Sequence, residues 1–448
     1  MWTSKTGKFP HKVIQQNPHQ TVDREIPGMP DKIRVIHSFP TTTTTTKNLT
    51  SYYQGFIPRE KLPFPLPQLC KKRKEQNNMK FSCEKSTLID AIGTASRAVS
   101  TKSTIALLEG LRITAADRLT LAGYDLAMGI RTSIDADIIE QGEIVLSAKL
   151  FGDIVRKLPD DIVYVETDEK MLTTIKCGRA VFNLVASASD DFPQMPEVDK
   201  TREISMPQPM LKSMIAQTIF AVSDNEAKPI HTGCLFETEG DRLNVVAVDG
   251  YRLSVRRETL DPAPEMDMKF VVPGTALREI ERILTDDKEK TVSVYPDEKH
   301  ILFEIGSTVL ITRLIDGEFL NYRSAIPQNF SHVVPVDARE LITCIERVSL
   351  IVSEKLKNPV RMNFDGPVVK MSCITAVGKS YDECALGEPV EGLEIGFNNR
   401  YLLDALRACA DEPIVMSLNG ALNPLVLSPA EGDKFTYLVL PVRLKAGE

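Results

Sequence analysis

A pattern of apolar and small polar residues occurs three times in this chain, at intervals of roughly 125 residues. The three copies of this Leu-x3-Ile-x6-Val-Ser pattern begin at Leu88, Leu211 and Leu341. A second repeated element, an acidic residue followed by Ile or Ala, any residue and Arg, begins at Asp153, Glu279 and Asp404. Repeats of about 20 to 50 residues build solenoids, whereas units of about 100 to 150 residues can each bury a core of their own. We therefore predict three consecutive globular domains of one architecture.

Charge and proline content separate the start of the chain from the rest. Residues 1–78 contain 13 Lys and Arg against 5 Asp and Glu, a net charge of +8, which leaves −15 for the remainder. They also contain 9 of the 28 prolines, a threonine run at 41–46 and a basic cluster at 71–74. Such a composition cannot bury enough apolar surface to offset the entropy of ordering, so we predict a disordered basic extension over 1–78. The predicted folded domains are 79–200, 201–329 and 330–448.

Two interpretations of residues 1–78 stay open. The extension can be a basic arm that contacts nucleic acid, or a non-essential segment upstream of a functional start at Met79. In the second case its removal leaves the folded domains intact.

Apolar periodicity predicts two helices and several short strands in each domain. The predicted helices span about 86–99, 147–158, 208–222, 273–285, 337–352 and 398–410. Alternating apolar and polar residues predict antiparallel strands, for example at 80–84, 110–114, 119–122, 243–247, 308–312 and 435–440. The predicted fold class is α+β, with three repeated domains in which two helices pack on antiparallel sheets.

Basic residues recur on or next to the predicted helices of an otherwise acidic body. This distribution is expected if the helices meet DNA phosphates while the outer surface repels them, although a solvated helix face explains any single residue equally well. No series of aromatic residues accompanies the basic ones, which argues against a single-strand binder. The candidate DNA contacts are Lys102, Lys149, Lys228 and Arg282.

Motifs of catalysis, metal binding and membrane insertion are missing from the sequence. It contains no Gly-rich phosphate loop, no Gly-x-Ser-x-Gly and no His-Glu-x-x-His, and paired carboxylates such as Asp190 and Asp191 are typical of solvated turns. The eight cysteines have no metal-ligand spacing and predict reduced thiols in the cytoplasm. No apolar run approaches the ~18 residues that span a bilayer. We predict no catalytic residue, no cofactor and no metal.

Five motifs in order carry a family resemblance over residues 79–444. They are Met79-Lys80-Phe81, Ala247-Val248-Asp249-Gly250-Tyr251-Arg252-Leu253, Leu314-Ile315-Asp316-Gly317-Glu318-Phe319, Glu394-Ile395-Gly396-Phe397-Asn398 and Leu440-Pro441-Val442-Arg443-Leu444. Together they resemble the bacterial DNA polymerase III beta subunit, the β sliding clamp. Residues 1–78 have no counterpart in that family.

The resemblance implies a head-to-tail homodimeric ring that encloses duplex DNA and tethers a polymerase without doing chemistry. It also implies a groove between the second and third domains for short apolar peptides of the DNA polymerase III alpha subunit, the clamp loader and other clamp-motif proteins. The runner-up is a clamp-like monomeric scaffold that binds partner peptides without encircling DNA. The mass of the protein in solution separates the two.

Residue by residue, the resemblance assigns two further sites. The peptide groove would use Val248, Gly250, Tyr251, Arg252, Leu253, Leu320, Asn398, Tyr401, Leu422, Pro424, Val439, Leu440, Pro441, Val442 and Arg443. The dimer interface would bring Phe182 and Leu184 of one subunit against Leu350 and Ile351 of the other, although a core position explains all four as well.

The sequence departs from the family pattern at three places. Leu320 stands where the family often has Pro, and His231 where it has an apolar residue. Thr104-Ile105-Ala106 replaces a Thr-Leu-Pro segment after Lys102. The depth of the peptide pocket and the details of DNA contact are therefore expected to differ from those of relatives.

Overall fold

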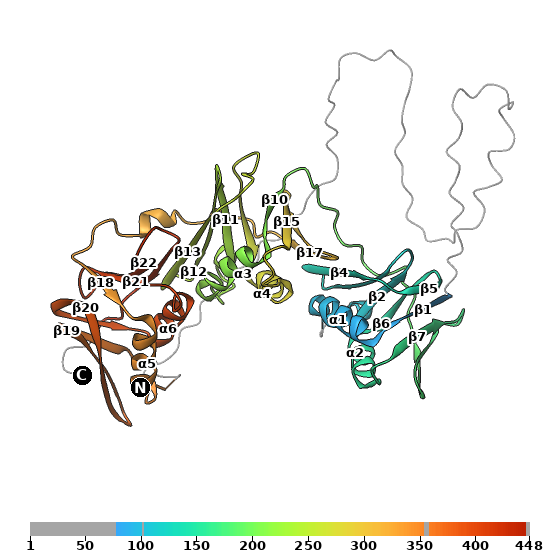
Figure 1. The fold of residues 1–448 in the computed structure, drawn as a ribbon, viewed down its shortest axis with the longest axis horizontal. Coiled ribbons are helices and arrows are strands. Elements are labelled where there is room, and N and C mark those ends of the chain that lie inside the picture. Colours follow the sequence, from blue (N-terminus) through green and yellow to red (C-terminus); the bar gives the residue numbers. More distant parts are fainter. Residues whose placement is uncertain (1–77, 101–102, 354–357, 445–448) are drawn as a thin grey trace, which may run out of the picture. The chain divides into compact units, whose positions relative to one another are not determined.

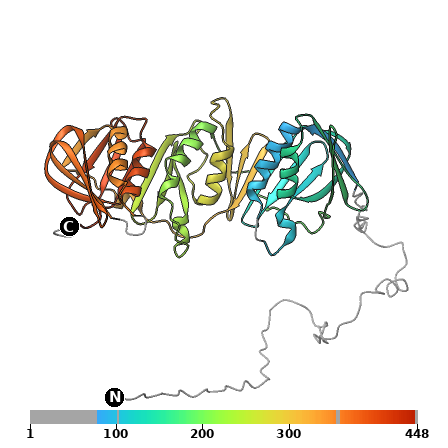
Figure 2. The same cartoon turned by 90° about the horizontal axis from the view of Figure 1, so that it is seen from below.

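The computed structural model describes residues 78–100, 103–353 and 358–444 (Figure 1). The predicted disordered extension thus lies outside the described residues, except for Asn78. The described chain contains three successive sets of two α-helices with antiparallel strands, as the repeat predicts. In each set the two helices lie side by side against the sheets (Figure 2).

The first domain contains α1 (Lys85–Ala95) and α2 (Ala148–Lys157). Its strands are β1 (Met79–Glu84), β2 (Gly110–Ala115), β3 (Leu119–Tyr124), β4 (Met128–Ile134), β5 (Asp137–Glu140), β6 (Gly142–Ser147), β7 (Ile162–Thr167), β8 (Leu172–Cys177) and β9 (Ala180–Val185). One sheet has the order β5-β1-β7-β8-β9, and β4-β3-β2-β6 belong to another. Apolar side chains of both helices and both sheets, among them Leu88, Ile113, Phe151 and Val165, form one buried core.

The second domain contains α3 (Gln208–Ala216) and α4 (Gly274–Ile283). Its strands are β10 (Ile204–Pro207), β11 (Gly233–Glu239), β12 (Arg242–Val248), β13 (Arg252–Thr259), β14 (Lys269–Pro273), β15 (Thr291–Pro296), β16 (His300–Ile305) and β17 (Thr308–Arg313). These strands form two four-strand runs, β10-β15-β16-β17 and β14-β11-β12-β13. The second run also buries apolar residues on its other face, where the segment after β17 packs with Phe319 and Tyr322.

The third domain contains α5 (Ala338–Ser349) and α6 (Asn399–Ala408). Its strands are β18 (His332–Val336), β19 (Val360–Thr375), β20 (Gly378–Phe397), β21 (Ile414–Leu418), β22 (Leu425–Pro429) and β23 (Phe435–Val439). Strands β19 and β20, of 16 and 20 residues, pair as one long hairpin whose register shifts twice. The sequence predicted only short strands here, because irregularities in the pairing interrupt the alternation that a long strand would show.

Two strand pairings continue the sheets from one domain into the next. Strand β17 pairs with β4, with Leu310 opposite Ile130, and so joins the first and second domains. Strand β13 pairs with β23, with Arg252 opposite Val439, and joins the second and third domains. The resulting two sheets have eight strands each.

The first helix of each of the first two domains ends earlier than predicted. Helix α1 ends at Ala95 and continues as a 3-10 turn over Ser96–Ala98, and α3 ends at Ala216, followed by a 3-10 turn at Ile219–Ala221. In the second case the Thr218 hydroxyl donates hydrogen bonds to the carbonyl oxygens of Met214 and Ile215, 2.7 and 3.2 Å away. Because this side chain satisfies carbonyls of the last turn, the helix ends there although the apolar pattern continues.

The second helix of the first domain begins where its capping residue predicts. The Ser147 hydroxyl accepts a hydrogen bond from the Leu150 amide at 3.5 Å, and α2 follows directly. It ends at Lys157, just before the predicted terminator Pro159. None of the helices in the described residues is long and apolar enough to cross a membrane.

Candidate functional site

The start of β13 and the end of β23 bring the predicted peptide-binding residues of two domains together. Beyond the paired strands, the Leu440 amide donates a hydrogen bond to the Tyr251 carbonyl oxygen at 2.8 Å. The Val442 amide donates to the Gly396 carbonyl oxygen at 2.7 Å, just before α6 begins. The segment 440–442 is thereby fixed between the loop before β13 and the residues that precede α6.

The loop before β13 is a tight turn stabilised by one carboxylate. Asp249 Oδ1 accepts hydrogen bonds from the amides of Tyr251 and Arg252, at 2.8 and 3.0 Å. Between them Gly250 has a φ of 92°, a left-handed conformation that a residue with a side chain rarely adopts. The turn presents Tyr251 to solvent, with 61% of its surface exposed, and turns Arg252 inward, with 7% exposed.

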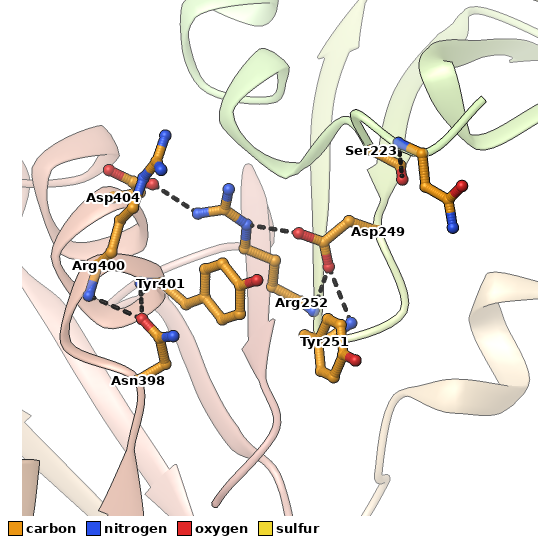
Figure 3. A network of polar contacts seen from close by, with 9 residues as sticks. Ser223, Asp249, Tyr251, Arg252, Asn398, Arg400, Tyr401 and Asp404 are labelled. Atoms are coloured by element: carbon orange, nitrogen blue, oxygen red, sulfur yellow. Dashed lines mark hydrogen bonds and ion pairs between the residues drawn. The ribbon is translucent and has the colours of Figure 1, made fainter. Parts of the chain in front are cut away.

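The buried guanidinium of Arg252 is held by two carboxylates from different domains (Figure 3). Its Nε donates to Asp249 Oδ2 at 3.0 Å, and its Nη1 donates to Asp404 Oδ2 on α6 at 2.6 Å. A buried charge without such partners would be strongly destabilising. The pair with Asp404 therefore ties the second domain to the third.

Two aromatic rings flank this guanidinium, and a third stacks on one of them. Arg252 Cζ lies 4.5 Å from the centroid of the Tyr401 ring and 5.5 Å from that of Phe220, within the range of cation–π attraction. The Tyr401 and Tyr251 rings stack, with centroids 5.9 Å apart and planes at 23°. Burial, with the nearby Asp249 charge as a smaller cause, raises the pKa of Tyr401.

The position of Tyr401 is set by the start of α6. Asn398 caps this helix, since its Oδ1 accepts hydrogen bonds from the amides of Arg400 and Tyr401 at 3.0 and 3.3 Å (Figure 3). Tyr401 and Asp404 are three residues apart and so lie on one face of the helix. That face is directed at Arg252.

The remaining predicted groove residues divide by exposure. Val248, Leu253 and Val439 are buried in the sheet and lie beneath the surface. Leu320 packs against the same apolar cluster as Val248 and Leu253. The exposed residues are Leu422 at 67%, Leu440 at 39%, Val442 at 38% and Arg443. Pro441 and Pro424 are half-buried. Pro424 directly precedes β22, whose first residue, Leu425, pairs with Val439.

Sequence reasoning did not assign Asp249, Asp404 or Phe220 to the site. Asp249 lies inside the motif 247–253, and an Asp at the start of a Gly-containing turn often accepts a hydrogen bond from the backbone amide two residues later. The sequence could therefore have indicated its role. Asp404 belongs to the repeated acidic element, yet it lies 152 residues from its partner Arg252. Nothing in the sequence indicates that the two meet.

The candidate DNA contacts have different surroundings. Lys102 lies outside the described residues. Lys149, in the first turn of α2, and Lys228, before a 3-10 turn at Pro229–Thr232, are exposed and form no ion pair with any residue that the structure describes. Arg282 is exposed at the end of α4, but its Nη1 lies 2.5 Å from Glu279 Oε1.

Several other basic residues of the helices are also ion-paired. Glu279 accepts from Arg97 of the first domain at 3.0 Å, in addition to Arg282. The remaining pairs are Arg156 with Asp153, Lys212 with Asp286, Arg347 with Asp382 and Arg407 with Glu346. Pairing lowers their net attraction for phosphate, which leaves Lys149 and Lys228 as the stronger candidates.

The four predicted interface residues lie at two separate places. Phe182 and Leu184 are on β9, the last strand of its sheet, which among the described strands pairs only with β8. Phe182 is 38% exposed, and Leu184 packs against the core of the first domain. Leu350 follows α5 and is 84% exposed, and Ile351 is half-buried. A core position therefore does not explain Leu350.

The described residues contain no group of three or more His, Cys, Asp or Glu side chains that could hold a metal ion. The seven described cysteines are all free and buried. Arg252 forms ion pairs with both Asp249 and Asp404, and the tyrosines beside them stack. This arrangement is suited to binding.

Comparison with known proteins agrees with this geometry over nearly all the described chain. Residues 79–196, 205–321 and 323–443 match the N-terminal, central and C-terminal domains of the DNA polymerase III beta subunit. The beta sliding clamp of Bacillus subtilis (strain 168) is 32% identical over 377 residues, which cover 82% of this chain and 100% of that protein.

Solved structures of the same kind superpose on this fold. A putative DNA polymerase III beta subunit from Eubacterium rectale has a TM-score of 0.78 and 36% identity, and covers 82% of this chain and 100% of its own. A sliding clamp from Pseudomonas aeruginosa, solved bound to griselimycin, has a TM-score of 0.77 and 25% identity with the same coverage. The chain belongs to the DNA polymerase III beta subunit family, the beta sliding clamps, which are non-catalytic processivity factors of DNA replication.

Proposed function

We propose that two copies of this chain join head to tail around duplex DNA, and that the surface at Tyr251 and Tyr401 tethers DNA polymerase III and other replication or repair proteins. The observation that carries the tether is the exposed Tyr251 ring, stacked on Tyr401 and flanked by exposed Leu440 and Val442. Exposed aromatic and aliphatic side chains beside a few fixed polar groups suit an apolar peptide.

The ring is supported by an open strand edge and an exposed leucine. Strand β9 offers an unpaired edge among the described strands, and Leu350 exposes an apolar side chain that an interface would cover. Pairing of one subunit's β9 region with the other subunit's Leu350 region gives a head-to-tail contact, and two such contacts close a ring.

Contact with DNA is supported by Lys149 and Lys228, which are exposed near helix starts and turns. Closed topology retains DNA even when each contact is weak, and phosphate contacts carry no sequence information, so the ring can slide. The proposed location is the cytoplasm, where the replication machinery of bacteria acts.

Two measurements test this function. The mass of the purified full-length protein in solution should be about twice the 49.9 kDa of one chain. A fluorescent peptide with Gln, Leu and a terminal Leu-Phe pair should bind, and Tyr251→Ala should weaken it without changing the mass. A monomer that still binds the peptide would favour the monomeric scaffold, and a dimer that binds no such peptide would refute the tether.

The choice of variant follows from burial. A charge-introducing change such as Leu253→Lys would place a charge at a position that is 2% exposed inside a paired strand. That change would unfold the sheet and report on stability. Tyr251 is 61% exposed, so its truncation reports on binding.

A further inference from the structure

The Arg252 guanidinium is held at more points than a single ion pair between the two domains would provide. Arg252 is 7% exposed, and each of two carboxylates contacts a different nitrogen of its guanidinium. Because the guanidinium is planar, contacts at Nε and Nη1 fix the direction of its plane as well as its position.

The fixed plane lies over an aromatic ring that belongs to the proposed peptide site. Arg252 Cζ is 4.5 Å from the Tyr401 centroid, and Tyr401 stacks on the exposed Tyr251. Contacts thus run without a gap from Asp404 through Arg252 and Tyr401 to a ring that is open to solvent (Figure 3).

We propose that Asp404 and Asp249 are positioning residues for partner peptides: they hold Arg252 over Tyr401 and so pre-form the Tyr251–Tyr401 surface that the peptide contacts. The inference rests on the proposed tethering function. Neither carboxylate touches the peptide. Each carboxylate restricts the motion of Arg252 and Tyr401 before the peptide arrives. Without it, peptide binding would have to order these side chains, and that entropy cost would lower the affinity.

Loss of Asp404 has a specific consequence. Its removal leaves Arg252 paired with Asp249 alone and takes the charged acceptor away from Nη1, so the guanidinium is held at one edge only and can turn toward water. Tyr401 then loses the cation against its face and gains rotational freedom. We therefore expect Asp404→Asn to weaken peptide binding about tenfold, which corresponds to about 1.4 kcal/mol.

A matched control exists at the same domain joint. Arg242 of β12 forms an ion pair with Asp433, which precedes β23, and this pair also links the second domain to the third. It has no contact with the stacked tyrosines among the described residues. Asp433→Asn should therefore leave peptide affinity unchanged, whereas a general weakening of the joint would reduce it in both variants.

The experiment measures peptide affinity by fluorescence anisotropy in the full-length dimer, with the Gln, Leu and Leu-Phe peptide as the probe. We compare the wild type with Asp404→Asn, Asp404→Glu and Asp433→Asn. We also compare Tyr401→Leu alone with the double variant that carries both Tyr401→Leu and Asp404→Asn. We expect a tenfold loss in Asp404→Asn, partial recovery in Asp404→Glu and almost no effect of Asp404→Asn once Tyr401 is Leu. If Asp404 only stabilised the fold, its replacement would weaken binding equally with Tyr401 and with Leu at position 401, so this last comparison separates the two roles.

Each outcome decides the proposal. Wild-type affinity in Asp404→Asn, an equal loss in Asp433→Asn, or the same loss with and without Tyr401 would overturn it while leaving the tether intact. Failure of the wild-type dimer to bind the peptide would overturn both the tether and this inference.

Discussion

The proposed ring depends on Leu350, and its replacement gives the sharpest test. The side chain is 84% exposed in the single chain, so Leu350→Ala should change the stability of the domain little. Truncation removes three carbons at about 0.8 kcal/mol each when buried, which for a side chain this exposed amounts to about 2 kcal/mol per interface.

A ring of two chains contains two equivalent interfaces, so the variant should lose about 4 kcal/mol of dimerisation free energy. Since about 1.4 kcal/mol corresponds to a tenfold change, the dissociation constant of the dimer should rise by roughly a thousandfold. Sedimentation velocity over a dilution series from micromolar to nanomolar protein measures this shift directly.

Met266→Ala is the matched control, because Met266 is 50% exposed on the loop between β13 and β14 and belongs to neither predicted interface region. Its dimer should dissociate as the wild type does. The reasoning would be refuted by an unchanged dimer in Leu350→Ala. A fall in thermal stability of several degrees without dissociation would instead assign Leu350 to a role within its own domain.

Three further predictions concern DNA, the thiols and His231. Lys149→Glu and Lys228→Glu should each shorten the time that the protein stays on circular duplex DNA. Each should also reduce the slope of log affinity against log salt concentration by the amount of about one phosphate contact. A base-specific footprint of the wild type would contradict the sliding model. Burial raises the pKa of thiols such as Cys234 to about 12, so a thiol reagent at pH 8 should reach the described cysteines only after denaturation, as absorbance of the released product would show. Burial, and to a smaller extent the nearby Lys228 charge, lowers the pKa of His231 in the folded protein. As pH falls below about 6.5, the unfolded state therefore binds a proton at this residue before the folded state does, and the free energy of unfolding decreases. His231→Phe should show a smaller drop in melting temperature between pH 7.5 and 5.5, and an equal drop in both proteins would show that other groups cause it.

The repeat and the periodicity predicted the three α+β domains because both signals are local. A helix such as α2 is defined by a capping Ser147 and a terminating Pro159, which are a few residues from the turns they affect. The ends of α1 and α3 were placed too late because 3-10 turns keep the apolar spacing of the helix that they follow. The length of β19 and β20 was missed because shifts in register interrupt their alternation.

The candidate site was predictable only in part. The turn at 249–251 and the cap at Asn398 are local features, and the resemblance assigned the residues around them. Asp404 could not be assigned, since its role depends on the pairing of β13 with β23, a contact between distant segments. Likewise, Arg282 was a candidate DNA contact, but it shares the Glu279 carboxylate with Arg97 of the first domain, a contact that the sequence alone does not show.

The two joints between domains differ in chemistry, and the difference explains where the partner surface lies. At the first joint, Met128 and Ile130 of β4 belong to the buried apolar core of the second domain, and an ion pair, Arg97 with Glu279, lies at the surface beside them. Apolar packing of this kind contributes stability but little directional preference. At the second joint, Arg242 and Arg252 each reach a carboxylate of the third domain, and Arg257 donates to the Asp433 carbonyl oxygen.

Charged hydrogen bonds fix orientation, because they lose most of their energy when donor and acceptor are misaligned. A surface assembled from two domains must keep its aromatic rings in one arrangement to bind a short peptide tightly, since few contacts are available to compensate for disorder. The second joint meets that requirement through Arg252 and its two carboxylates. The ion pair of Arg97 with Glu279 at the first joint makes no cation–π contact with any ring among the residues described here, whereas Arg252 lies over Tyr401. The chemistry of the joint and the position of the partner site are therefore consequences of the same pairing of β13 with β23.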